Sequence, residues 1–164
     1  MPLLSTISAA LKGVWFLKKI KPCQRVLEIG SGSGWVREKL AVQGVHDLTT
    51  FDLLPPADIV GDIRDYAALG LVQESFDVII AFELVEHVDC LKQCHELLRP
   101  GGTLMLTSPL PPMDPLLNFF EDIGLNQRRT TPHTNLTYFR SINFFRKKVV
   151  LYPGFMAQWG IFVK

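Results

Sequence analysis

The stretch VLEIGSGSG (residues 26–34) decides how this chain folds. Its first four residues form a short, mostly apolar run, which is typical of a strand buried on both faces of a parallel sheet. Three glycines follow at alternate positions, and a helical pattern begins at Trp35. Glycine at such a turn lets the backbone adopt positive φ and pass close under a ligand, while free N–H groups at the helix start face it. The stretch therefore predicts a ligand-binding turn at the end of a buried strand.

Apolar runs and helical patterns continue to alternate along the chain. The helix after the fourth strand is expected to end at Arg99-Pro100-Gly101-Gly102, a sequence that stops helices. Two β-rich pieces near the C-terminus, residues 148–152 and 158–163, are expected to form an antiparallel pair at the sheet edge. The pattern predicts an α/β protein with a Rossmann-like open sheet, mostly parallel, with an antiparallel strand near the C-terminus. The other expected strands are 25–29, 48–51, 59–60, 76–82 and 103–107, and the expected helices are 35–42 and 84–98.

Three segments depart from this alternation. The link 52–59 is too short for a crossover helix and contains two prolines, so we expect it to be irregular. Residues 108–139 are rich in proline and read as a substrate-side insertion with one short helix over 114–123. Residues 1–21 are expected to form an amphipathic helix packed on the domain, with peripheral membrane contact as the alternative. The apolar residues at helical spacing in that helix are Leu4, Ile7, Leu11, Val14 and Trp15.

Composition limits the class of protein. The chain has 164 residues, of which 48% are hydrophobic, enough to bury one core without disulfides, so we expect a single domain over residues 1–164. Three cysteines without metal or redox spacing predict a reducing compartment, the cytoplasm. No apolar stretch approaches the roughly 20 residues of a membrane span, and the N-terminal lysines follow the apolar run, which is unlike a signal sequence.

Charge is segregated along the chain although the net charge is only +1. All 16 acidic residues lie between Glu28 and Asp122, whereas both ends are basic. Two readings stay open: solvated helix faces, or surfaces that meet differently charged ligands, with an anionic acceptor or partner.

Carboxylates end two successive strands. Asp52 follows the second strand, where α/β nucleotide sites place an acid that accepts from ribose hydroxyls. Asp62 follows the third strand, where it can meet an exocyclic amine while Ile63 covers a ring face. Each aspartate alone is more often a cap or turn former, but together they predict a nucleoside pocket. Trp35 stands where a dinucleotide fingerprint needs glycine, which argues against NAD.

With the motifs ELVEHV (residues 83–88) and LRPGG (residues 98–102), the chain resembles the class I S-adenosylmethionine-dependent methyltransferases over residues 21–108. The resemblance implies a seven-stranded sheet whose last strand is antiparallel. It also implies a cofactor, S-adenosylmethionine, and places Phe82 and Glu83 beside its sulfonium and the acceptor. The cofactor residues that it implies are Glu28, Gly30, Ser31, Gly32, Gly34, Asp52, Leu53, Asp62, Ile63, Phe82 and Glu83.

Two histidines are candidates for a general base. His87 and His133 could accept a proton from a methyl acceptor that must lose one. Glu83 is a third catalytic candidate. The alternative for each histidine is a structural role, which is the more common one for a single histidine. Glu83, Glu86 and His87 lie at i, i+3 and i+4, so a helix there would carry them on one face, and His133 could close the set. Such a set suits a divalent metal and is similar to that of metal-dependent small-RNA 2′-O-methyltransferases. The same pattern occurs without metal, so we expect no metal and keep this set as the alternative.

Basic and aromatic residues interleave in the C-terminal third. They could bind phosphates and stack on bases, although we favour aromatic residues in the core and a cationic face in water. The basic residues are Arg128, Arg129, Arg140, Arg146, Lys147, Lys148 and Lys164, and the aromatic ones are Tyr138, Phe139, Phe144, Phe145 and Tyr152.

The sequence therefore predicts an enzyme that transfers a methyl group from S-adenosylmethionine to an unidentified acceptor by in-line displacement. A metal-assisted RNA 2′-O-methyltransferase is the first alternative. The chain is short for this family, so a non-catalytic cofactor-binding or regulatory subunit is the second. Assembly as a homodimer or with a partner subunit stays open.

Overall fold

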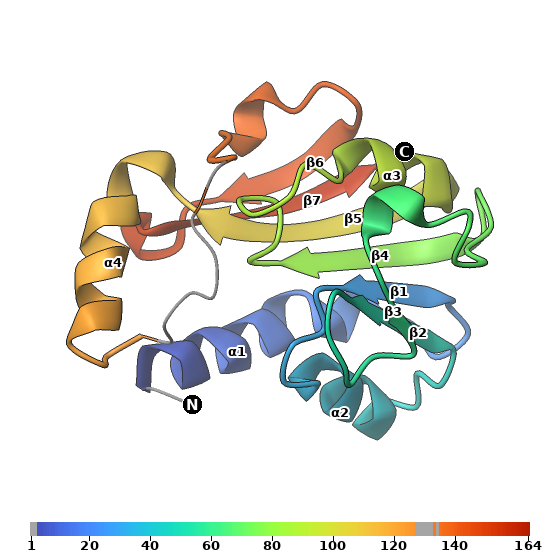
Figure 1. Ribbon diagram of the computed structural model, residues 1–164, viewed down its shortest axis with the longest axis horizontal. Helices are drawn as coiled ribbons and strands as arrows, with labels where there is room; N and C mark the ends of the chain where they lie inside the picture. The colour runs from blue at the N-terminus through green and yellow to red at the C-terminus, as the bar shows by residue number, and fades with distance from the viewer. Residues whose placement is uncertain (1–2, 127–132, 134) are drawn as a thin grey trace.

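The computed structural model describes residues 3–126, 133 and 135–164. Within these residues, seven strands form one sheet in the order β3-β2-β1-β4-β5-β7-β6 (Figure 1). β7 runs antiparallel to both of its neighbours, and the other neighbouring strands are parallel. The expected Rossmann-like, mostly parallel sheet is confirmed. The strands are β1 (Val26–Ile29), β2 (Leu48–Asp52), β3 (Ile59–Val60), β4 (Phe76–Phe82), β5 (Leu98–Pro109), β6 (Arg146–Leu151) and β7 (Ala157–Val163).

The nearly continuous apolar run of β4 is explained by burial on both faces of the sheet. Val78 and Ile80 point into one core, and Ile79 and Ala81 point into the other. The first core is covered by α1 (Leu3–Trp15) and α2 (Trp35–Val42), the second by α3 (Leu91–Leu97) (Figure 1). The remaining helix is α4 (Asp114–Asp122), and the short 3-10 turns are η1 (Leu17–Lys19), η2 (Ile63–Asp65), η3 (Pro111–Met113), η4 (Phe139–Ser141) and η5 (Pro153–Phe155).

The helix expected over residues 84–98 is wrong in its first half. Residues 84–90 form a turn and an irregular segment, and α3 begins only at Leu91. The backbone of Glu83 is left-handed, with φ of 50°, and it forms a bend directly after β4. Three side chains expected on one helix face therefore belong to a turn: Glu83, Glu86 and His87.

The expected N-terminal helix is present, but three of the five residues in its apolar stripe are exposed, while Trp15 packs against the core. Ile7, Leu11 and Val14 are 47%, 54% and 58% exposed, whereas Lys12 is 6% exposed. Periodicity located the helix, and a polar contact of Lys12 sets its rotation. No described helix has the length and apolar character that crossing a membrane requires.

The C-terminal third folds back onto β5. β7 pairs with β5 and β6 pairs with β7, which confirms the antiparallel pair, with β6 at the sheet edge. Fully buried Gln158 on β7 holds the chain before η4: its Oε1 accepts from the Phe139 N–H, and its Nε2 donates to the carbonyls of Thr137 and Pro109. The predicted short helix is α4, and the link 53–58 is irregular as expected.

Candidate functional site

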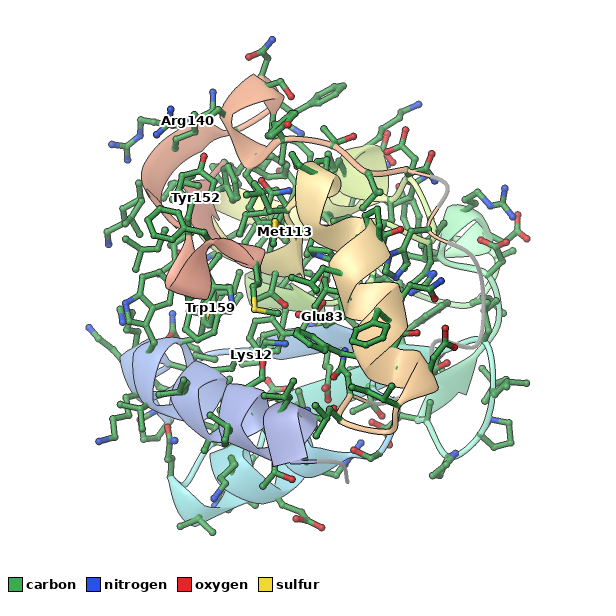
Figure 2. All side chains as sticks on the ribbon, turned by 90° about the vertical axis from the view of Figure 1, so that its left-hand side faces the viewer. Lys12, Glu83, Met113, Arg140, Tyr152 and Trp159 are labelled. Carbon is green, nitrogen blue, oxygen red and sulfur yellow. The ribbon has the colours of Figure 1, made fainter. Side chains whose placement is uncertain are left out.

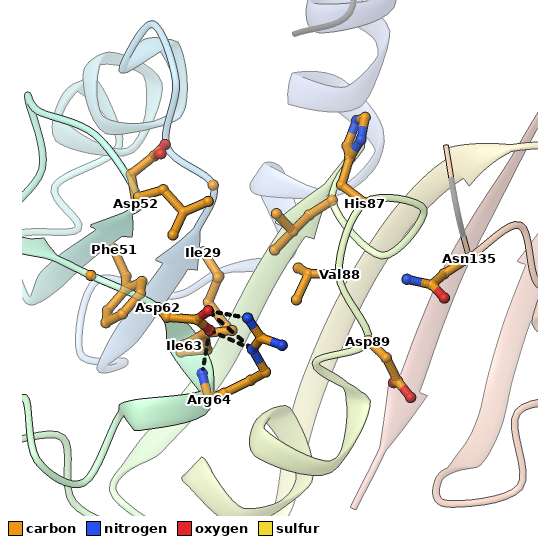
Figure 3. A pocket seen from close by; sticks show the side chains of 14 residues that line it. Ile29, Phe51, Asp52, Asp62, Ile63, Arg64, His87, Val88, Asp89 and Asn135 are labelled. Carbon is orange, nitrogen blue, oxygen red and sulfur yellow. Dashed lines mark hydrogen bonds and ion pairs between the residues drawn. The ribbon is translucent and has the colours of Figure 1, made fainter. Parts of the chain in front are cut away.

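A pocket of about 510 Å³ lies at the carboxyl ends of β1, β2 and β3 (Figure 3). Its opposite wall comes from the turn after β4, between Leu84 and Asp89, and from Asn135. Parallel strands bring their carboxyl ends to one edge, which is where ligands of open α/β sheets bind. Five residues that the sequence analysis assigned to a cofactor line the pocket: Gly30, Asp52, Leu53, Asp62 and Ile63.

The glycine-rich turn forms one rim of this pocket. Gly30, Gly32 and Gly34 have φ angles of 78°, 47° and 75°, which a side chain would disfavour. A Cβ on Gly30 would lie 3.1 Å from Leu84, so the turn passes close to the opposite wall. The N–H of Gly32 donates a 2.9 Å hydrogen bond to Oδ2 of Asp52. This bond fixes the ends of β1 and β2 relative to each other.

Two buried polar atoms beside the turn have no hydrogen-bond partner among the described residues. They are Oε2 of Glu28 and Oγ of Ser31, in residues that are 3% and 4% exposed. Burial raises the pKa of Glu28 to about 8, against the opposing charge of Arg37. Neither residue lines the pocket. A ligand group that donates hydrogen bonds, such as an ammonium, would satisfy both atoms.

Asp62 is held by Arg64, a pocket residue that sequence reasoning missed. Nε of Arg64 donates to both carboxylate oxygens of Asp62, at 2.9 and 3.0 Å, and a second guanidinium nitrogen reaches Oδ2 (Figure 3). These hydrogen bonds lower the pKa of Asp62 to about 2. Asp62 is therefore an acceptor at any physiological pH, and Ile63 beside it is buried. The spacing Asp-x-Arg, with Arg64 two positions after Asp62, was the sequence signal that could have identified this contact.

Glu83 stands directly after β4 and bonds to two other elements. Its carboxylate accepts from the Thr107 hydroxyl at 2.9 Å and from the Lys12 ammonium at 2.6 Å. Burial opposes ionisation of Glu83, but the charge of Lys12 and these hydrogen bonds outweigh burial and lower its pKa. Much protein surrounds the carboxylate, yet 43% of the side chain is accessible, so a ligand can reach it. Phe82, before it, stacks on Trp35 at 6.0 Å and does not line the pocket.

Glu86, His87 and His133 converge without the helix that was expected to align them. One potential ligand atom from each lies within 4.8 Å of the others, and Glu83 is not part of this group. Nδ1 of His133 contacts Oδ1 of Asp114, the first residue of α4, at 2.5 Å. The two imidazole rings are 4.8 Å apart.

Glu86 is the most buried member of this group. Its side chain is fully buried, and both carboxyl oxygens lack a hydrogen-bond partner among the described residues. Burial, and then the negative charge of Glu83, raise the pKa of Glu86 to about 9. The carboxyl group is thus protonated at neutral pH unless a cation is bound beside it.

The C-terminal aromatic residues are divided between core and surface. Phe139 and Phe145 are buried in the core, whereas Phe144 and Tyr138 are exposed. The guanidinium of Arg140 lies 5.2 Å from the ring of Tyr152. Phe139 and Phe145 are thus unavailable for base stacking. Arg128 and Arg129 lie outside the described residues.

Comparison with known proteins agrees with this fold. A family model described as a methyltransferase domain matches residues 6–148. A ubiquinone biosynthesis O-methyltransferase from Xylella fastidiosa is 35% identical over 102 residues, which is 51% of this chain and 41% of that protein. The match therefore spans less than half the length of this relative.

Solved structures share the fold at low sequence identity. An S-adenosylmethionine-dependent methyltransferase from Archaeoglobus fulgidus has a TM-score of 0.66 at 16% identity, covering 97% of this chain and 94% of that one. A Pyrococcus horikoshii protein has a TM-score of 0.68 at 16% identity, covering 97% and 89%. The chain belongs to the methyltransferase domain family, which confirms at family level the expected class of enzyme.

Proposed function

We propose that this chain transfers the methyl group of S-adenosylmethionine to a hydroxyl oxygen of an acceptor. The observation that carries the proposal is the pocket at the strand ends, lined by Asp52 and Asp62, in a chain of the methyltransferase family. Asp52 would accept from the ribose hydroxyls, and Asp62 from the adenine amine with Ile63 against the ring. Glu28 and the turn 30–34 would take the methionine ammonium.

The chain's own task in this reaction is alignment. When bound, S-adenosylmethionine supplies a sulfonium whose methyl carbon is already electrophilic. Holding the acceptor oxygen in line with that carbon is worth up to about 7–11 kcal/mol in the best-oriented cases. Glu83 follows β4, at the place where the methyl donor and the methyl acceptor would meet. Its accessible carboxylate can accept a hydrogen bond from the hydroxyl of the methyl acceptor.

The proton of the acceptor hydroxyl needs a base, and we assign this role to His133; His87, the other candidate, lines the pocket. Its Nδ1 contacts the Asp114 carboxylate, an arrangement that orients an imidazole. The word O-methyltransferase in the name of the Xylella relative supports oxygen as the acceptor atom.

The first test is binding. Calorimetry should detect S-adenosylhomocysteine and S-adenosylmethionine at sub-millimolar concentration, and absence of both heats contradicts the proposal. The second test is turnover by the purified chain on catechol and 3,4-dihydroxybenzoate, read as mass gain. We expect His133→Ala to lower the rate by roughly a hundredfold. Turnover by the chain alone would also dispose of the non-catalytic subunit alternative.

A second candidate is metal-assisted transfer to an RNA ribose hydroxyl. The convergence of Glu86, His87 and His133 favours it, because two imidazoles and a carboxylate suit a divalent metal with open positions. The burial of Phe139 and Phe145 weighs against RNA. Methylation of a short RNA oligonucleotide that requires added Mn²⁺ would support this candidate, and activity that persists with a chelator would contradict it.

A further inference from the structure

Helix α1 turns a lysine inward and apolar residues outward. Lys12 is 6% exposed, whereas Leu11 and Val14 beside it are more than half exposed. A helix that merely covers a sheet buries its apolar stripe. Burying an ammonium group costs free energy unless the charge is paired. The rotation of α1 is therefore explained by the partner of Lys12 together with the packing of Trp15 against the core.

That partner is Glu83, and the pair has a defined geometry. Nζ of Lys12 lies 2.6 Å from Oε1 of Glu83 and 5.7 Å from the centre of the Phe82 ring. The Thr107 hydroxyl donates to the same Oε1 at 2.9 Å. Within the described part of the chain, Oε2 of Glu83 accepts no hydrogen bond. Figure 2 shows Lys12 and Glu83 next to one another, Lys12 reaching in from α1.

We propose that Lys12 is a positioning residue of the methyl-transfer site, which acts by pairing with the Glu83 carboxylate so that the two form a neutral unit beside the donor sulfur. This inference rests on the proposed function, which puts Glu83 where donor and acceptor meet. It makes the N-terminal helix part of the reaction centre. The described contacts that carry it are those of Glu83 with Lys12 and Thr107.

The need for a neutral pair follows from the charge of the donor. A sulfonium is positive before transfer and the resulting thioether is neutral. An unpaired carboxylate would stabilise the donor more than the transition state, where this positive charge is already dispersing, and so would slow transfer. An unpaired lysine would repel the donor. The pair avoids both effects, and its second oxygen is left to orient the acceptor hydroxyl.

The test compares two ligands that differ in this charge. S-adenosylmethionine and S-adenosylhomocysteine share all other charged groups, so the ratio of their dissociation constants reports the potential at the sulfur. Glu83→Gln leaves the Lys12 charge unopposed, and we expect it to weaken S-adenosylmethionine relative to S-adenosylhomocysteine by about tenfold. Adding Lys12→Met should return the ratio to within about threefold of wild type. Calorimetry on the full chain measures the dissociation constants of both ligands for each variant.

The controls separate this role from a structural one. Lys12→Arg keeps the charge and should keep the wild-type ratio, and Lys18→Met, at an exposed lysine of η1, should leave it unchanged. A double variant that stays at the Glu83→Gln ratio overturns the inference, as does a Glu83→Gln ratio equal to wild type. If wild type binds neither ligand, the proposed function itself fails, which is a distinct result.

Discussion

The main-chain N–H of Asn135 donates a 2.9 Å hydrogen bond to the carbonyl oxygen of Glu86. A helix that began at Leu84 would use this carbonyl for the N–H of Cys90, four residues further on. Here the carbonyl of Glu86 accepts from Asn135 instead of Cys90, and Asn135 lies two residues after His133. The carbonyl of Glu86 thus makes a long-range contact in place of a helical one, and His133 lies beside Glu86 and His87.

The first prediction concerns Gln158, which holds this segment from the sheet. Gln158→Leu leaves the Phe139 N–H and the carbonyls of Thr137 and Pro109 without their partner. We expect the free energy of unfolding to fall by about 2–4 kcal/mol, measured by denaturant titration. Because the chain leading to His133 loosens, methyl transfer should fall more than the affinity for S-adenosylhomocysteine.

The control is Gln43→Leu, the same chemical change in a partly exposed residue at the end of α2. It should alter stability by less than about 0.5 kcal/mol. Equal losses in both variants would show that the Gln158 contacts contribute nothing specific.

The second prediction concerns Asp52. Asp52→Ala removes the pocket carboxylate and the partner of the Gly32 N–H. Calorimetric affinity for S-adenosylhomocysteine should drop at least about tenfold, the size expected for one lost charged hydrogen bond. Asp47→Ala removes an exposed carboxylate before β2, far along the strand from the pocket, and should leave the affinity unchanged. Similar losses in the two variants would argue against a ribose site at Asp52.

The third prediction concerns proton release at Glu28. With a pKa raised to about 8, the carboxyl of the ligand-free chain is protonated at pH 7. An ammonium bound beside it favours the carboxylate, so binding should expel a proton, and affinity should rise from pH 6 to about pH 8 and then level off. Calorimetry of S-adenosylhomocysteine in two buffers of different ionisation enthalpy measures the released proton. Glu28→Gln should abolish the release; release that persists in it assigns the proton to another group.

The strand ends of the pocket could be predicted because two local signals agree there. The bounds of α2 and β4 match the predicted ranges 35–42 and 76–82, since apolar runs and helical spacing report burial directly. Parallel strands then place Asp52 and Asp62 at the same edge. Nothing beyond the order of the elements is needed for that result.

The residues that sequence reasoning missed depend on contacts between distant segments. Lys12 meets Glu83 across 71 positions, and this polar contact overrides the apolar periodicity of α1. Asp114 reaches His133 across 19 positions that include residues outside the described ones. A local pattern locates an element, but its rotation and its partners are decided where elements dock.

The last prediction concerns Asp114, whose carboxylate contacts Nδ1 of His133. Asp114→Asn keeps the shape of the side chain and replaces the carboxylate that contacts Nδ1 of His133 by an amide. We expect the rate of methyl transfer to catechol at saturation to fall by roughly a hundredfold, with affinity for S-adenosylhomocysteine unchanged. Asp122→Asn, at the exposed far end of the same helix, should change neither quantity. A loss in affinity without a loss in rate would mean that Asp114 shapes the cofactor pocket and that the base must be sought elsewhere.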